Sequence, residues 1–109
     1  MPTVYKVLGQ SNPSATTNTT LYTVPSATSA VVSTITICNQ ASSAATYRIA
    51  IRPAGEAIAA KHYVVYGATV AASDTTALTL GVTLATTDVI TVYASTATLS
   101  FNAYGSEIS

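Results

Sequence analysis

The residues best suited to nucleophilic chemistry are the single cysteine, Cys38, and the single histidine, His62. A thiolate beside an imidazolium is a strong nucleophile, and with one imidazole in the chain any catalytic scheme must use His62. Free cysteine, however, is among the most buried residue types. We therefore expect Cys38, which follows Ile37, to be a small buried hydrophobe. We expect His62 to stand at the start of a strand, beside Lys61.

A paired-acid or metal site would have to be built from the four carboxylates, which are Glu56, Asp74, Asp88 and Glu107. All four fall in expected turns or in the C-terminal tail, and no aspartate-rich calcium loop is present. Asp74 and Asp88 each precede an expected strand, where a carboxylate accepts backbone N–H bonds in the turn. We expect that structural role for them, and no metal site.

Other chemical motifs are missing as well. The five glycines are isolated, and none lies between a strand and a helix as a phosphate-binding loop requires. A single cysteine excludes an internal disulfide and a thiolate metal cluster. The sequence thus predicts a protein that is not an enzyme, with no catalytic residue, no cofactor and no metal ligand.

Tyrosines supply most of the large side chains, since the chain has seven of them, one phenylalanine and no tryptophan. Patches of tyrosine can stack sugars or peptides. In strands that alternate, however, a tyrosine more often lines the edge of a core with its hydroxyl reaching water. We expect that position for Tyr47, for Tyr63 or Tyr66, for Tyr93 and for Tyr104.

Length and charge exclude several classes of protein. The chain has 109 residues, enough for one domain, and 7% of them are charged, against about 25% in an ordinary soluble domain. The basic residues Lys6, Arg48, Arg52 and Lys61 are too few and too scattered to bind nucleic acid. No apolar run of about 18 residues predicts a membrane span. The N-terminal residues lack the pattern of a signal peptide, so we expect synthesis in a cytoplasm.

The elements that would carry these side chains are strands. In residues 46–52 apolar and polar residues alternate, which predicts that Tyr47, Ile49 and Ile51 face a core while the two arginines face solvent. In residues 78–84 the same alternation predicts a bend at Gly81 and one shared face for Leu78, Leu80, Val82 and Leu84. Further strands are expected at 3–8, 20–24, 31–38, 62–66, 88–94 and 99–104, with Gly67 and Gly105 ending the strands before them.

Short strands at intervals of about 8 to 12 residues, separated by turn signals, predict an antiparallel β-sandwich. We expect the immunoglobulin-like or the jelly-roll type, with about seven to eight strands. Only residues 54–61 leave room for a helical turn. Residues 1–18 are expected to form an N-terminal strand and an extended arm or loop that orders against a neighbour, and residues 19–109 a single β-sandwich domain.

Such a domain is suited to packing against other protein. Low charge reduces the desolvation cost of association, and threonine on a strand presents a methyl group for contact. Exposed sheet edges must be covered by arms or paired with a neighbouring subunit. We therefore expect a homo-oligomer or an array.

Four stretches of the chain resemble small structural proteins of tailed bacteriophages, cyanophages included. They are Thr20–Pro25, Ala30–Asn39, Ala45–Ala50 and Leu99–Ile108. The similarity covers most of the chain from Thr19 onward and consists of strand and turn patterns, so it carries no functional residues over. The resemblance implies a virion component without enzymatic activity, made in the cytoplasm of the host bacterium and assembled onto the particle.

Within a virion, the expected role is a capsid decoration or cement protein whose partners are the major capsid protein and copies of itself. The alternative is a tail, baseplate or fibre module, with tail or baseplate proteins as partners. A third interpretation is a glycan-binding β-sandwich module, which the missing tryptophan and signal peptide weaken. No nucleic-acid or membrane partner is expected.

Overall fold

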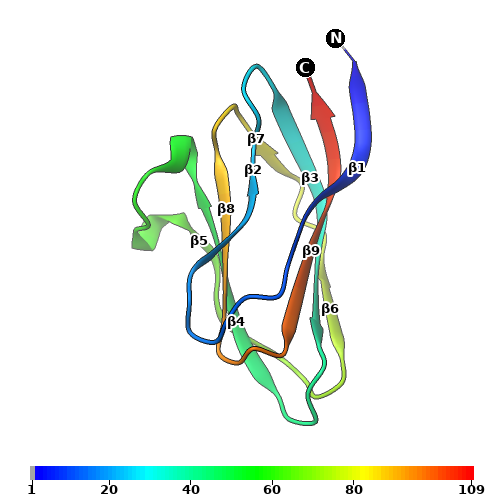
Figure 1. Cartoon of the computed structure of the whole chain (residues 1–109), viewed down its shortest axis with the longest axis vertical. Coiled ribbons are helices and arrows are strands. Elements are labelled where there is room, and N and C mark those ends of the chain that lie inside the picture. Colours follow the sequence, from blue (N-terminus) through cyan, green and yellow to red (C-terminus); the bar gives the residue numbers. More distant parts are fainter. Residues whose placement is uncertain (1) are drawn as a thin grey trace.

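The computed structural model describes residues 2–109 and shows an antiparallel β-sandwich, which confirms the predicted fold class. Over this range there are nine strands, more than the seven to eight expected, and no α-helix. Their bounds are β1 Thr3–Ser11, β2 Thr19–Thr23, β3 Ser29–Asn39, β4 Ala45–Arg52, β5 Tyr63–Val70, β6 Thr75–Leu78, β7 Val82–Leu84, β8 Val89–Ala94 and β9 Leu99–Ile108 (Figure 1).

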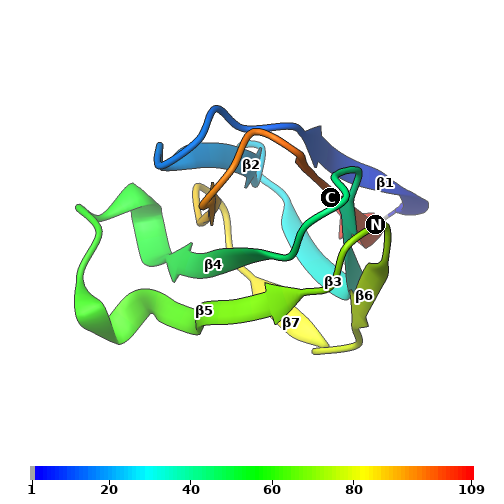
Figure 2. The same ribbon diagram turned by 90° about the horizontal axis from the view of Figure 1, so that it is seen from below.

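The strands form two layers. The first sheet has the order β1-β9-β3-β6, with β7 also paired to β3, and the second sheet has the order β2-β8-β4-β5 (Figure 2). If β6 and β7 are taken as one interrupted strand, the described chain pairs its first strand with its last, its second with the next to last, and so on inward to β4 and β5. This nested pairing is the jelly roll, so the structure decides between the two expected sandwich types.

The inner faces of the sheets follow the predicted alternation. Ile49 is fully buried, Tyr47 packs edge-on against Phe101 with ring centroids 6.2 Å apart, and Ile51 is half-buried against this core. The strand predicted at 31–38 lies in the middle of its sheet as β3, between β9 on one side and β6 and β7 on the other. Edge-on aromatic contacts and close-packed branched side chains of this kind hold the two layers together.

The predicted face of residues 78–84 is partly wrong. Leu84 is buried and Leu78 and Val82 are half-buried, but Leu80 is 43% exposed. The bend expected at Gly81 is present, with φ at +62°, and it separates β6 from β7. Because the chain leaves the sheet between these strands, the alternation is interrupted and Leu80 points to solvent.

The prediction that Gly67 and Gly105 end their strands is wrong, since β5 continues to Val70 and β9 to Ile108. Gly67 has φ +80° and forms a bulge, a conformation that glycine adopts without strain. Gly105 lies beside a bulge in β3, where a Cβ atom would overlap the carbonyl group of Val31. Both glycines let a strand continue through an irregular point.

The N-terminal segment lies on this chain's own sandwich. Residues 3–11 are β1, which pairs with β9 at the edge of the first sheet. The segment 12–18 then crosses to the second sheet. The Asn12 side-chain amide donates to the Leu99 carbonyl oxygen at 2.7 Å. The Thr16 N–H donates to the Ala94 carbonyl oxygen at 2.8 Å. These bonds tie the segment to the rim of the sandwich.

The helical turn expected within 54–61 is present as two short 3-10 turns, η1 (Pro53–Gly55) and η2 (Ala60–His62), in the loop between β4 and β5. In Figure 2 this loop projects from one side of the sandwich. No helix among residues 2–109 is long and apolar enough to cross a membrane.

Candidate functional site

Cys38 lies on the first sheet, whereas His62 lies in the loop that leads into the second sheet, so the two do not form a pair. Cys38 is on β3 of the first sheet, opposite Thr75 and Ser100. It is half-buried, so its predicted burial is wrong, because the alternation that turns Ile37 into the core turns Cys38 outward. His62 stands immediately before β5, as predicted, and is 4% exposed.

His62 holds the loop between β4 and β5 in place. Its Nδ1 accepts a hydrogen bond from the Ala59 N–H at 3.0 Å, so we assign the proton to Nε2, which lies 3.2 Å from Glu56 Oε1. Lys61 Nζ lies 3.8 Å from the same carboxylate oxygen. Both ring nitrogens of the histidine thus bind other residues of the loop, Ala59 and Glu56.

The turn carboxylates have the structural role predicted for them. Asp88 accepts from the Ala54 N–H at 2.9 Å and, through its other oxygen, from the Ala85 N–H at 2.8 Å. Asp74 accepts from the N–H of Thr75 at 2.8 Å. Over the described range 2–109, no three side chains among His, Cys, Asp and Glu come together in a group that could hold a metal ion.

Glu107 is the carboxylate whose surroundings the sequence did not predict. It lies within β9 instead of in a turn or tail, and its Oε2 accepts a hydrogen bond from the Tyr22 hydroxyl at 2.5 Å. Lys6 Nζ lies 3.2 Å from Oε1. The Tyr22 hydrogen bond, with help from Lys6, lowers the pKa of Glu107. Burial and the bond to Glu107 raise the pKa of Tyr22.

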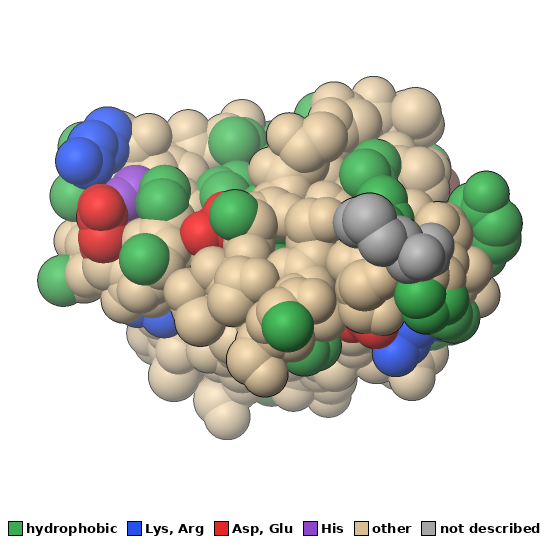
Figure 3. Space-filling model, turned by 90° about the horizontal axis from the view of Figure 1, so that it is seen from above, with side chains coloured by type: hydrophobic (Ala, Val, Ile, Leu, Met, Phe, Trp, Pro, Cys, Tyr) green, Lys and Arg blue, Asp and Glu red, His purple; other side chains and the backbone are tan. Residues whose placement is uncertain are grey.

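One exposed surface lies on the outer face of the first sheet, and we call it the β1–β9 apolar patch. Its members are Tyr5, Val7, Val31 and Tyr104. Tyr5 and Val31 both lie opposite Ser106 in the strand register, and Val7 lies opposite Tyr104. Together with Gly105 and Ser106 they line a hollow of about 640 Å³. Hydrophobic side chains gather on the right of Figure 3, on the side where Figure 1 places β1.

A second surface lies on the outer face of the second sheet, where one row of the register holds Tyr66, Arg48 and Tyr93. The Arg48 guanidinium carbon lies 4.2 Å from the centroid of each tyrosine ring, which is a cation–π sandwich. Tyr66 also meets Tyr63 edge-on at 4.9 Å and is 65% exposed. We call these four residues the tyrosine–arginine ladder.

The tyrosines are therefore not placed as expected. Tyr47 lies inside the core, 2% exposed, instead of at its edge. Tyr66, Tyr93 and Tyr104 lie on outer faces of the sheets. The strand alternation sets this division, because Tyr66 and Tyr93 share a face with Arg48 and not with Tyr47.

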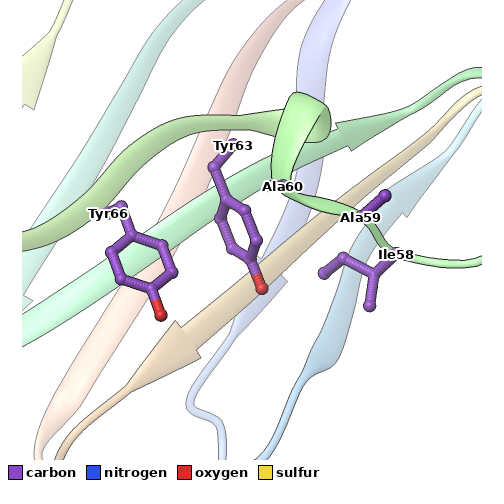
Figure 4. Close-up of a pocket in the computed structure, with 5 residues that line it drawn as sticks. All are labelled: Ile58, Ala59, Ala60, Tyr63 and Tyr66. Carbon is purple, nitrogen blue, oxygen red and sulfur yellow. The ribbon is translucent and has the colours of Figure 1, made fainter.

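The loop between β4 and β5 folds over part of the second outer face. The strand alternation places Ala50 and Thr91 on this outer face, yet both are buried. Ile58 of the loop and Thr91 line a hollow of about 150 Å³. On its other side Ile58 lines a hollow of about 590 Å³ with Tyr63 and Tyr66 (Figure 4). The loop thus turns a flat sheet face into two adjoining depressions.

Both candidate surfaces consist of residues that come together only through the strand register. Neither contains a set of groups arranged for bond-breaking chemistry; both offer aromatic and aliphatic contact, and the second adds a guanidinium. Comparison with models of protein families, with curated proteins and with solved structures gave no match to the chain.

Proposed function

We propose that this chain is a non-enzymatic structural protein of a bacteriophage virion, and most specifically a capsid decoration or cement protein. In this role it binds the lattice of the major capsid protein and neighbouring copies of itself. It is made in the cytoplasm of the host and joins the particle there. The observation that carries the proposal is the β1–β9 apolar patch.

The patch is suited to association with protein. Tyr5 is 84% exposed, so the fold of this chain gains little from its ring. Tyrosine and aliphatic side chains are the groups that anchor interfaces once water is excluded from them. The one charged residue that lines the hollow is Lys6, which is paired with Glu107, so burying the rest of the patch costs little desolvation free energy.

The edge of the first sheet strengthens this argument. β1 is the last strand of that sheet, so its outward backbone groups have no strand partner among the described residues. Exposed edges of this kind are paired or covered in stable assemblies. Because β1 also carries Tyr5 and Val7, a partner that covers the edge would bury part of the patch in the same contact.

The fold agrees with the proposal without deciding it. Jelly rolls build viral capsid proteins and also lectin domains, and a fold by itself does not fix a function. The resemblance to small phage structural proteins favours the virion over a cellular lectin. A tail, baseplate or fibre module remains the alternative, since it would use the same apolar patch against tail proteins.

The test is binding to phage heads that lack this chain. We expect the wild-type protein to bind the heads and to raise the temperature at which they release DNA, because a ligand of the assembled state stabilises it. Tyr5→Ser should weaken binding by about tenfold or more, as loss of an interface anchor does. The matched control is Tyr66→Ser, which removes an exposed tyrosine from the opposite sheet and should bind like the wild type.

Two results would contradict the proposal. Absence of binding to heads would exclude the decoration role, and binding to isolated tails instead would favour the tail module. Wild-type affinity in Tyr5→Ser would show that the patch is not the contact surface.

A further inference from the structure

The guanidinium of Arg48 is held rigidly and has free hydrogen-bond donors. Two tyrosine rings, Tyr66 and Tyr93, enclose its faces at 4.2 Å. The ion pairs among residues 2–109 join Lys6 to Glu107, and Lys61 and His62 to Glu56, and none of them includes Arg48. Stacking occupies the faces of a guanidinium and leaves the N–H groups at its edge available.

Arg52, four residues further along the same strand, differs from Arg48 in this respect. Its Nε donates to Thr91 Oγ1 at 3.1 Å, and one of its terminal nitrogens donates to the Glu56 carbonyl oxygen at 3.1 Å. The structure therefore uses Arg52 to hold the loop over the sheet. No such internal bond among residues 2–109 involves the Arg48 guanidinium, which is half-buried, so its N–H groups are open to solvent or to a ligand.

The chemistry of Arg48 favours a single carboxylate as the acceptor of these N–H groups. A planar guanidinium offers parallel N–H donors that match the two oxygens of a carboxylate. A phosphate site would gather several cations or backbone N–H groups, whereas the row around Arg48 contains neutral tyrosines. One fixed positive charge matches a ligand group that carries one negative charge.

The adjoining hollow fits a sugar ring. Ile58, Tyr63 and Tyr66 line a space of about 590 Å³, which lies within the range of small-molecule sites (Figure 4). The C–H face of a pyranose packs on aromatic and aliphatic side chains while its hydroxyls stay at the rim. Beyond Ile58, the smaller hollow offers amide and hydroxyl groups from Asn18 and Thr20 to those hydroxyls. Arg52 also lines this hollow, but its guanidinium already donates to Thr91 and to the Glu56 carbonyl oxygen.

We infer that the outer face of the second sheet binds a carboxylated saccharide, one that carries a uronate or sialate unit. Arg48 binds the carboxylate, and the hollow between Ile58 and Tyr63 receives a sugar ring. This inference adds a binding activity to the proposed structural role. It uses none of the residues of the β1–β9 apolar patch, so either can fail without the other.

The test begins with an array of uronate- and sialate-containing oligosaccharides printed beside their neutral counterparts. The best acidic glycan and its methyl ester are then titrated in solution. We expect the acid to bind and its ester to bind about tenfold or more weakly, because a charge-assisted hydrogen bond is lost. Arg48→Gln should lose a similar factor, and Arg48→Lys should recover only part of it because lysine lacks the planar fork.

The matched control is Lys61→Gln, which removes one positive charge from the neighbouring loop and leaves the tyrosine–arginine ladder intact. It should bind the glycan like the wild type. Thermal unfolding of each variant shows whether the fold is retained. If Arg48→Gln does not fold, the comparison of the acid with its methyl ester on the wild type and the partial recovery in Arg48→Lys carry the test.

Three results would overturn the inference. The first is an array without acidic hits at about 1 mM ligand. The second is equal affinity for the acid and its methyl ester. The third is equal or tighter binding of a hexaglutamate peptide, which would show that the site recognises a carboxylate of protein origin.

Discussion

The Tyr22 hydroxyl donates a 2.5 Å hydrogen bond to Glu107, a residue 85 positions further along the chain. The bond joins β2 of the second sheet to β9 of the first, and Lys6 on β1 reaches the other carboxylate oxygen. A charged hydrogen bond of this kind contributes more to stability than a neutral one. It fastens the two layers near the end of the sandwich where the chain termini lie.

This bond predicts that the free energy of unfolding falls at acid pH. The pKa of Glu107 is below its ordinary value of 4.5, so its contribution is present above that value and is lost as the pH falls through the lowered pKa. Tyr22→Phe removes the bond and should cost about 1 to 3 kcal/mol of the free energy of unfolding at pH 7. The difference between the variant and the wild type should shrink at pH 3, as measured by urea titration.

The same pair predicts that the free energy of unfolding also falls at alkaline pH. Since the pKa of Tyr22 is raised above its ordinary value of 10.0, the unfolded chain loses this proton first, and stability falls as the pH rises beyond that value. Tyr22→Phe should lack this part of the fall. Tyr5→Phe, at an exposed tyrosine, is the control. If Tyr5→Phe changes the acid and the alkaline loss of stability as Tyr22→Phe does, the pair of Tyr22 and Glu107 is not the cause of these losses.

The core and the exposed bend should respond differently to truncation. Ile49 is fully buried, so Ile49→Ala should cost about 2 to 5 kcal/mol by leaving a cavity. Leu80→Ala should cost less than about 1 kcal/mol, because its side chain already meets water. Equal shifts of the midpoint in a denaturant titration would place Leu80 in the core after all.

Two glycine substitutions separate backbone strain from lack of space. Around Gly67 no other heavy atom lies within 4 Å of an added Cβ, so Gly67→Ala should cost only the strain of a positive φ, about 1 to 2 kcal/mol. At Gly105 the added atom overlaps the Val31 carbonyl, and the backbone of two strands must shift. We expect Gly105→Ala to be clearly the more destabilising in thermal unfolding.

Removing the His62 ring should loosen the loop between β4 and β5 while the sandwich stays folded. In His62→Ala the Ala59 N–H loses its acceptor, and Glu56 loses one of its two partners and keeps Lys61. Hydrogen exchange at the Ala59 amide should become faster, whereas the amides of β3 should keep their protection, because local opening is independent of global unfolding. Unchanged exchange at Ala59 would show that the loop is held by other contacts.

The fold was largely predictable because the alternation of side chains along a strand can be recognised from a few neighbouring residues. The alternation around Ile49 predicted its strand and its burial correctly, and the β-branched run of residues 31–38 predicted a central strand, which is β3. Leu80, Gly67 and Gly105 were misjudged because bulges and bends break the period, and their position depends on the partner strand.

The candidate surfaces were not predictable for a related reason. Tyr66, Arg48 and Tyr93 belong to three strands, and the register that aligns them is shifted by bulges within β5. Glu107 and Tyr22 meet only because β2 and β9 belong to opposite layers that face each other. Periodicity shows which face a residue takes, whereas contacts across strands require the completed sheet.

The pairing of β1 with β9 also has a consequence for synthesis. β1 leaves the ribosome before the other described strands, and it has to wait for β9 before it has a neighbour in its sheet. The first sheet is therefore completed only after β9 has been made, and folding is slow because most pairings join distant parts of the chain. During that delay the apolar side chains of β1 are unprotected, so the yield of soluble protein should depend on chaperones and on the rate of expression.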